Sequence, residues 1–258
     1  MEERNVGPVG TERPLRSDLE ADPAPARTGL DDPRALTILT TEHWSLLTAR
    51  SLVYNEAFSR TAMFLTFLTG TLVALGFVSQ GSGYTPEFLV LAVILLGFDL
   101  FIGLATLGRL ISANAEDLRS LQAMNRLRHA YMKMVPGLDR YVSTSTYDDL
   151  EAVLSTYGPA AGANLAATGP SPIVGVAHAL TTTTGMVGTI SAAVGGALGA
   201  ALALFFGASA GVSVIAGVVA FVVLFGLISA MAARSFAAVE RSLDVRFPPP
   251  SRPDGSDR

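Results

Sequence analysis

The chain has 258 residues, half of them hydrophobic and only 16% charged, well below the roughly 25% of an ordinary soluble domain. This balance favours an integral membrane protein, and the formal net charge of −4 excludes the basic field of a nucleic-acid-binding protein. The absence of cysteine excludes disulfides, thiolate chemistry and cysteine metal sites.

The two ends of the chain are polar. The first 31 residues are acidic, rich in proline and almost free of large apolar side chains. Such a segment cannot bury enough surface to offset its ordering entropy, so residues 1–31 are predicted to be a disordered tail without a signal peptide. Residues 247–258, which include three consecutive prolines, are predicted to be a second disordered tail.

A long helix is predicted to begin near residue 32. Asp32 can cap it, and Pro33 then takes the first helical position, where a missing N–H costs nothing. No proline or glycine interrupts residues 34–68, so the helix is predicted to run unbroken into the first apolar segment. Its polar part would extend roughly 40 Å. Within it, Glu56 and Arg60 have the spacing of a helical salt bridge.

Four apolar segments are long enough to cross a bilayer. Because a hydrocarbon core about 30 Å thick needs about 20 apolar residues of helix, residues 62–78, 88–107, 184–206 and 212–232 are predicted to be transmembrane spans. The alternative is a soluble protein with four buried helices, which is disfavoured because four such segments contain a single charged residue, Asp99.

All eighteen Lys and Arg residues lie on one side of the predicted membrane. Seven precede the first span, six lie between the second and third, and five follow the fourth, whereas loops 79–87 and 207–211 hold none. Because Lys and Arg stay on the cytoplasmic side, both termini of this multi-pass plasma-membrane protein are predicted to be cytoplasmic. Arginine outnumbers lysine 17 to 1, as in proteins from GC-rich bacterial genomes.

The second helix is predicted to continue beyond its span. Apolar residues recur every three or four positions from residue 111 to the break at Pro136-Gly137. The polar extensions of the first two helices are therefore predicted to pair as an antiparallel stalk, so that residues 32–135 form one long hairpin. Asn114 falls in the apolar stripe, where it fixes the register of the stalk or else faces water.

Residues 136–171 are predicted to be a further cytoplasmic helix and a linker. Thr146 can cap this helix, the acidic residues after it suit its N-terminal end, and Gly158-Pro159 stops it. Residues 172–246 are predicted to form a second hairpin with spans three and four, starting near Ile173.

Asp99 is the candidate functional residue inside the membrane. A carboxylate near the bilayer centre costs about 2.5–3.5 kcal/mol on insertion scales, so it needs a partner or a wet cavity. Counting from the inner ends of the first two spans places Thr66 and Thr69 at its depth, so they are its predicted neighbours. Either Asp99 lines a path for a cation or a proton, or it is protonated or hydrogen-bonded to Thr66 or Thr69 and holds two helices together.

The third span carries two rows of small residues. They are Gly188, Ala192, Gly196 and Ala200 in one row, and Gly195 and Gly199 in the other. Small residues let helix backbones approach closely in lipid. The rows are predicted either to pack against the fourth span, which a short turn holds alongside, or to form an oligomer interface or pore wall.

Nothing in the sequence indicates an enzyme, a cofactor or a metal site. It has no phosphate-binding glycine loop, no paired histidines on a helix and no nucleophile elbow. The adjacent Glu42, His43 and Trp44 have no nucleophile or second metal ligand nearby, so they are interpreted as surface residues with one aromatic packing anchor.

The segment LTTEHWSLLTARSLVYNEAFSR, residues 39–60, runs into the first span and resembles a group of actinobacterial membrane proteins of unknown function. The layout of a polar helix, two spans and a return helix is also similar to that of SLATT-type two-span domains, which implies a membrane effector of bacterial conflict systems. The second hairpin departs from that layout, and neither resemblance assigns a functional residue.

We therefore expect an all-α membrane protein of two helical hairpins with a cytoplasmic stalk. The leading hypothesis is an oligomeric pore or channel-like membrane effector, motivated by Asp99 and the small-residue rows. The alternative is a structural or recruiting membrane protein whose stalk binds a cytoplasmic protein partner. The expected partners are thus the lipid bilayer, further copies of the chain or a cytoplasmic protein, with no nucleic acid. A small secondary transporter is disfavoured because no inverted repeat stands out.

Overall fold

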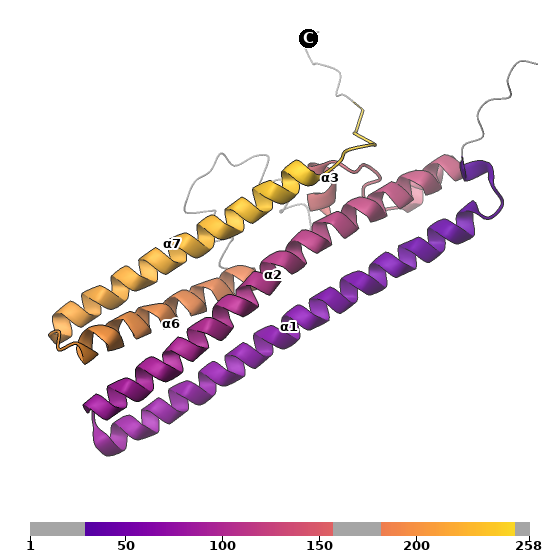
Figure 1. Cartoon of the computed structure of the whole chain (residues 1–258). Helices are drawn as coiled ribbons and strands as arrows, with labels where there is room; N and C mark the ends of the chain where they lie inside the picture. The colour runs from indigo at the N-terminus through magenta and orange to yellow at the C-terminus, as the bar shows by residue number, and fades with distance from the viewer. Residues whose placement is uncertain (1–28, 157–181, 251–258) are drawn as a thin grey trace, which may run out of the picture.

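A computed structural model of the protein describes residues 29–156 and 182–250. Within these ranges all regular structure is helical, without a strand. Four long helices run alongside one another (Figure 1): α1 (Ala35–Ser82), α2 (Pro86–Met134), α6 (Thr183–Phe205) and α7 (Ala210–Ser242). Each is long and apolar enough to cross a membrane, which confirms the prediction of four apolar helices.

α1 is one unbroken helix of 48 residues, as predicted. The helix begins at Ala35 and not at Pro33 as predicted, and the Asp32 carboxylate accepts a hydrogen bond from the Arg34 N–H (2.8 Å) just before it. α1 ends at Gly83, whose φ of +64° lies in the left-handed region that favours glycine. Thr85 then caps α2 with its side chain, and Pro86 takes the first helical position. This tight turn places the two longest helices side by side.

α2 is the central helix of the bundle. It packs against α1 on one side and α6 on the other, and α6 packs against α7. Along α2, buried residues recur at alternating spacings of four and three, and this buried seam comprises Ala92, Leu96, Asp99, Gly103, Thr106, Leu110, Ala113 and Asp117. A repeat of 3.5 residues keeps one face of a helix against its partner over many turns.

Two apolar clusters hold the helices together. The larger joins all four long helices and contains Ala57, Phe64, Leu107, Leu110, Ala113, Val187, Ala192 and Ile228. The smaller joins α2 and α7 to the short helix α3 (Leu150–Ser155) and contains Leu118, Leu121, Val153, Leu154 and Val239. Large apolar side chains also cover the outside of α7, among them Val214, Val218, Val222 and Leu227. Lipid is the medium in which such a continuous apolar face is stable.

Outside the four long helices, the described residues contain only short helices. Gly29–Asp31 form a 3-10 turn, η1, at the end of the predicted N-terminal tail, and Leu138–Tyr141 form a second, η2, just after the break at Pro136-Gly137. α3 begins at Leu150, later than the predicted cap at Thr146. The predicted stop at residues 158–159, the predicted start near residue 173, and residues 1–28 and 251–258 of the two tails lie outside the described residues.

Candidate functional site

Asp99 is buried inside the helix bundle. Only 1% of it is exposed, and its Oδ2 has no hydrogen-bond partner. It lies on the buried seam of α2, one helical turn before Gly103. The predicted spans of the other three helices contain no charged residue, so they supply no cation to pair with it. A carboxyl group in such apolar surroundings is costly unless a proton or a cation neutralises it.

Ser191 of α6 is a second buried polar residue without a partner. Its Oγ is fully buried and makes no hydrogen bond. A Cβ on Gly103 would lie 2.6 Å from this oxygen and 2.9 Å from the Phe64 ring, so only glycine fits there. α1, α2 and α6 therefore meet within one turn of Asp99. Ser191 was not among the predicted site residues, because a serine in an apolar helix carries no signal of burial.

Thr66 and Thr69, the predicted neighbours of Asp99, lie on the exposed face of α1. Their hydroxyls donate to carbonyls of their own helix, at 2.9 Å and 2.8 Å. The edge-to-face contact of Phe67 with Phe98 does place this part of α1 level with Asp99. The structure therefore does not bring the predicted group together. The buried threonine in this region of α1 is Thr71, two turns beyond Phe64.

The small residues of α6 are in contact with helices of the same chain. Gly196 of α6 and Gly217 of α7 oppose each other, and a Cβ on either would lie 2.9 Å from the carbonyl oxygen of the other. A Cβ on Gly217 would also lie 3.1 Å from the Cβ of Ala200. Backbones this close tolerate only the smallest side chains. This part of the first row is therefore occupied by α7.

The remaining small residues are used in the same way. A Cβ on Gly199 would lie 2.8 Å from the Ala220 Cβ, and one on Gly195 would overlap the Leu224 side chain at 2.0 Å. Gly188 lies against Ile228 of α7 and Leu107 of α2, and Ala192 is fully buried in the larger apolar cluster. Packing within the chain thus accounts for both rows.

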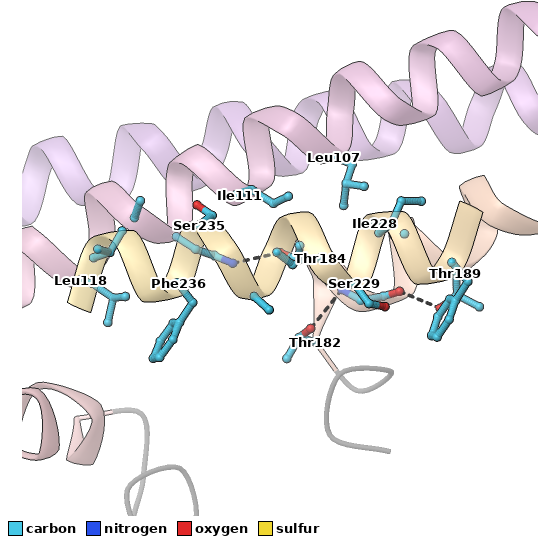
Figure 2. A pocket seen from close by; sticks show the side chains of 18 residues that line it. Leu107, Ile111, Leu118, Thr182, Thr184, Thr189, Ile228, Ser229, Ser235 and Phe236 are labelled. Atoms are coloured by element: carbon cyan, nitrogen blue, oxygen red, sulfur yellow. Dashed lines mark hydrogen bonds between the residues drawn. The ribbon is translucent and has the colours of Figure 1, made fainter. Parts of the chain in front are cut away.

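A cavity of roughly 410 Å³ lies among α2, α6 and α7, where the predicted spans give way to polar sequence (Figure 2). Asn114 donates to the Thr184 hydroxyl (3.0 Å) at this cavity, so it bonds to α6 instead of fixing the pairing of α1 with α2. The Thr182 hydroxyl caps α6 by accepting from the Gly185 N–H (3.0 Å). None of the lining residues is charged, so the cavity offers no group for acid–base chemistry.

The polar halves of α1 (residues 35–61) and α2 (residues 108–134) are joined by a buried ion pair. The Arg50 guanidinium donates to both carboxylate oxygens of Asp117, and the Tyr54 hydroxyl donates to Oδ2 (2.9 Å). This pair was not predicted from the sequence, because Arg50 and Asp117 lie on different helices, 67 positions apart. Nearer the spans, the predicted bridge between Glu56 and Arg60 is confirmed at 3.0 Å.

Asp148 is a buried carboxylate that fixes the C-terminal segment. It accepts hydrogen bonds from the N–H groups of Arg246 (3.0 Å) and Phe247 (2.7 Å) and from the Arg126 guanidinium of α2 (2.8 Å). Burial alone would raise the pKa of the Asp148 carboxyl, but these hydrogen bonds together hold it below its ordinary value. The ring of Phe247, where the predicted tail begins, stacks on His129 at 4.2 Å.

An apolar groove, which we call the tip groove, lies between the ends of α1 and α2 that are farthest from the apolar segments. Its volume is roughly 620 Å³, and it is lined by Leu36, Thr40, His43, Trp44, Leu47, Tyr131, Met134, Val135 and Leu138. Trp44 is 66% exposed, and Leu36 and Val135 are also exposed. The predicted role of Trp44 as a packing anchor is therefore wrong, because the ring stands at the surface.

Two basic groups with few partners lie at the tip groove: His43 lines it, and Arg128 lies just outside the lining, one helical turn before Tyr131. The partly buried Arg128 guanidinium donates to the Asn125 side chain (2.6 Å), and no carboxylate of the described residues pairs with it. Burial lowers the pKa of Arg128, and the Arg50 cation lowers it further. Burial and the Arg128 cation likewise lower the pKa of His43, whose buried Nδ1 has no hydrogen-bond partner. The lowered pKa favours the neutral form of His43, so the positive charge beside the groove is that of Arg128.

Comparison with known proteins adds no relative. No family model, curated protein or solved structure matches the chain. The resemblances to actinobacterial membrane proteins and to SLATT-type domains stay predictions.

Proposed function

We propose that the chain is a membrane-anchored recruiting protein. Its four apolar helices cross the plasma membrane as two hairpins, with both termini in the cytoplasm. The polar halves of α1 and α2 form a cytoplasmic stalk, and the tip groove docks a cytoplasmic protein.

The observation that carries this proposal is the apolar surface at the tip groove. Trp44, Leu36 and Val135 are exposed in a part of the chain that lies outside every predicted span. At 1.5 Å per residue, Trp44 lies roughly 27 Å of helix away from the start of the first span. Lipid therefore does not cover these side chains, and a clustered apolar surface in water is typical of a protein interaction site.

The connection between groove and spans also supports recruitment. α1 and α2 run without a break from the groove into the apolar segments. The buried pair of Arg50 with Asp117 holds the two helices together between these regions. A partner bound at the groove would thus be held at a defined distance from the membrane.

Site-specific photocrosslinking in living cells tests the proposal. A photoreactive amino acid at Trp44 or Val135 should capture a cytoplasmic protein. The matched control is Leu52, which is equally exposed on α1 but lies outside the groove. Capture at the groove positions and not at Leu52 is the expected result. No capture, or equal capture at all three positions, would contradict docking at the groove.

The unpartnered carboxylate of Asp99 favours a second candidate, an oligomeric pore or channel-like effector. Two of its original supports are weaker, because both small-residue rows pack within the chain and Thr66 and Thr69 bond to their own helix. The discriminating test is the protein mass in mild detergent, followed by ion flux in proteoliposomes for the wild type and Asp99→Asn. A defined oligomer whose flux is lost on substitution would put the pore ahead. A monomer without flux leaves recruitment in front.

A further inference from the structure

The tip groove has the form that accepts a helix. It lies between two long helices, and apolar residues of both line it, with Leu36, Trp44 and Leu47 on α1 and Tyr131 and Met134 on α2. The Tyr131 hydroxyl donates to the Leu39 carbonyl of α1 (3.1 Å) and so holds the two helices at this spacing. An amphipathic helix binds such a groove by inserting apolar side chains spaced three or four residues apart.

The charges near the groove select among amphipathic helices. Arg128 has no carboxylate partner in the described chain, whereas the neighbouring cation Arg50 is already neutralised by Asp117. A partly buried cation is destabilising unless a carboxylate pairs with it. A partner that supplies this carboxylate would gain a charge-assisted hydrogen bond.

We infer that the tip groove binds an acidic amphipathic helix of a partner protein, with its apolar face against Trp44 and a carboxylate on Arg128. The inference rests on the proposed recruiting function and narrows the class of partner. A basic helix with the same apolar face would place a second cation beside Arg128, and the repulsion between the two cations would weaken its binding. A purely apolar helix would fill the groove but leave Arg128 unpaired.

The protein contains its own reporter for this binding. Trp44 is the only tryptophan of the chain, so the intrinsic tryptophan fluorescence comes from the groove alone. The full-length protein in lipid nanodiscs would be titrated with two synthetic helical peptides without tryptophan, which share a leucine face and carry either glutamates or lysines on the other. The glutamate peptide should shift the Trp44 emission to shorter wavelength and bind about tenfold more tightly than the lysine peptide. Empty nanodiscs correct for binding to lipid.

Two substitutions assign the preference to Arg128. Arg128→Gln should reduce the preference for the glutamate peptide to about twofold or less, while Arg128→Lys should retain part of it. The matched control Arg119→Gln removes an exposed cation of the same helix and should leave the preference unchanged. If Arg128→Gln does not fold, the wild-type preference must instead weaken steeply with added salt, because it is electrostatic.

The outcomes separate this inference from the function on which it rests. If both peptides bind with equal affinity, or if Arg128→Gln keeps the full preference, the acidic partner is refuted and recruitment stands. If neither peptide changes the Trp44 emission, both the inference and the docking role of the groove fail. If a second copy of the chain occupies the groove, a doubled protein mass and failure of the peptides to compete would also refute the inference.

Discussion

The close approach of α6 and α7 at Gly217 can be tested with one methyl group. In Gly217→Ala, the new Cβ would lie 2.9 Å from the Gly196 carbonyl oxygen and 3.1 Å from the Ala200 Cβ, both shorter than ordinary van der Waals contact. The oxygen belongs to the backbone, so the two helices must separate to relieve the overlap. Overpacking of this kind costs about 1–3 kcal/mol, and the higher helix propensity of alanine returns up to about 1 kcal/mol. We expect a net loss of about 1–2 kcal/mol in the free energy of unfolding.

The assay is reversible unfolding in mixed micelles by added denaturing detergent, followed by circular dichroism. The matched control is Gly226→Ala on the same helix, where nothing lies within 4 Å of the new Cβ. The control gains helix propensity without a clash, so it should be neutral or slightly more stable than the wild type. If Gly217→Ala is as stable as Gly226→Ala, the helices do not approach as described. The small residues of α6 would then be free to contact another chain.

Four further predictions concern residues outside the predicted spans. Asp148→Asn should speed hydrogen exchange at the Phe247 amide. A neutral side-chain oxygen accepts hydrogen bonds from the Arg246 and Phe247 N–H groups and from the Arg126 guanidinium more weakly than a carboxylate does. The pKa of the Asp148 carboxyl is lowered in the folded state, so the ionised carboxylate stabilises the fold at pH values above its ordinary pKa of 3.8. This stabilisation should be lost as the pH falls below 3.8, and the exchange rate of the Phe247 amide should then rise. Asp117→Ala should lower the free energy of unfolding by about 3 kcal/mol, because it breaks a buried ion pair, and a change below 0.5 kcal/mol would show that the pair is weak. Because the chain has no cysteine, a single cysteine introduced at Tyr84 or Tyr141 gives a unique labelling site. The two variants should react with an impermeant maleimide from opposite sides of the membrane, and labelling of both from one side would contradict the proposed topology.

The helices were predictable from sequence because the signals for them are local. The long apolar segments, the Thr85 cap with Pro86 at the start of α2, and Gly83 after α1 are signals that act within a few residues. Thus the unbroken α1 and the four apolar helices follow from the sequence. The depth of Asp99 relative to α1 was also predictable, because residues can be counted along each helix.

The contacts between helices were harder to predict, because they depend on which face of a helix meets its partner. Thr66 and Thr69 share the depth of Asp99 but lie on the wrong face, and the difference is a rotation of α1 that no residue count reveals. Asp148 was predicted to suit the N-terminal end of a helix and Asp117 was not predicted to have a role, because the groups that both bind are distant in sequence. Trp44 differs in the other direction: its apolar ring predicted a packing anchor, but the side chain is exposed.

The continuity of α2 has a mechanical consequence. The same rigid rod carries Tyr131 of the tip groove, the Asp117 pair and the unpartnered Asp99, which lies about 50 Å from Tyr131 along the axis. Because α2 has no break between these residues, it has no hinge there, so the tip groove and the buried carboxyl are held at a fixed separation along one element.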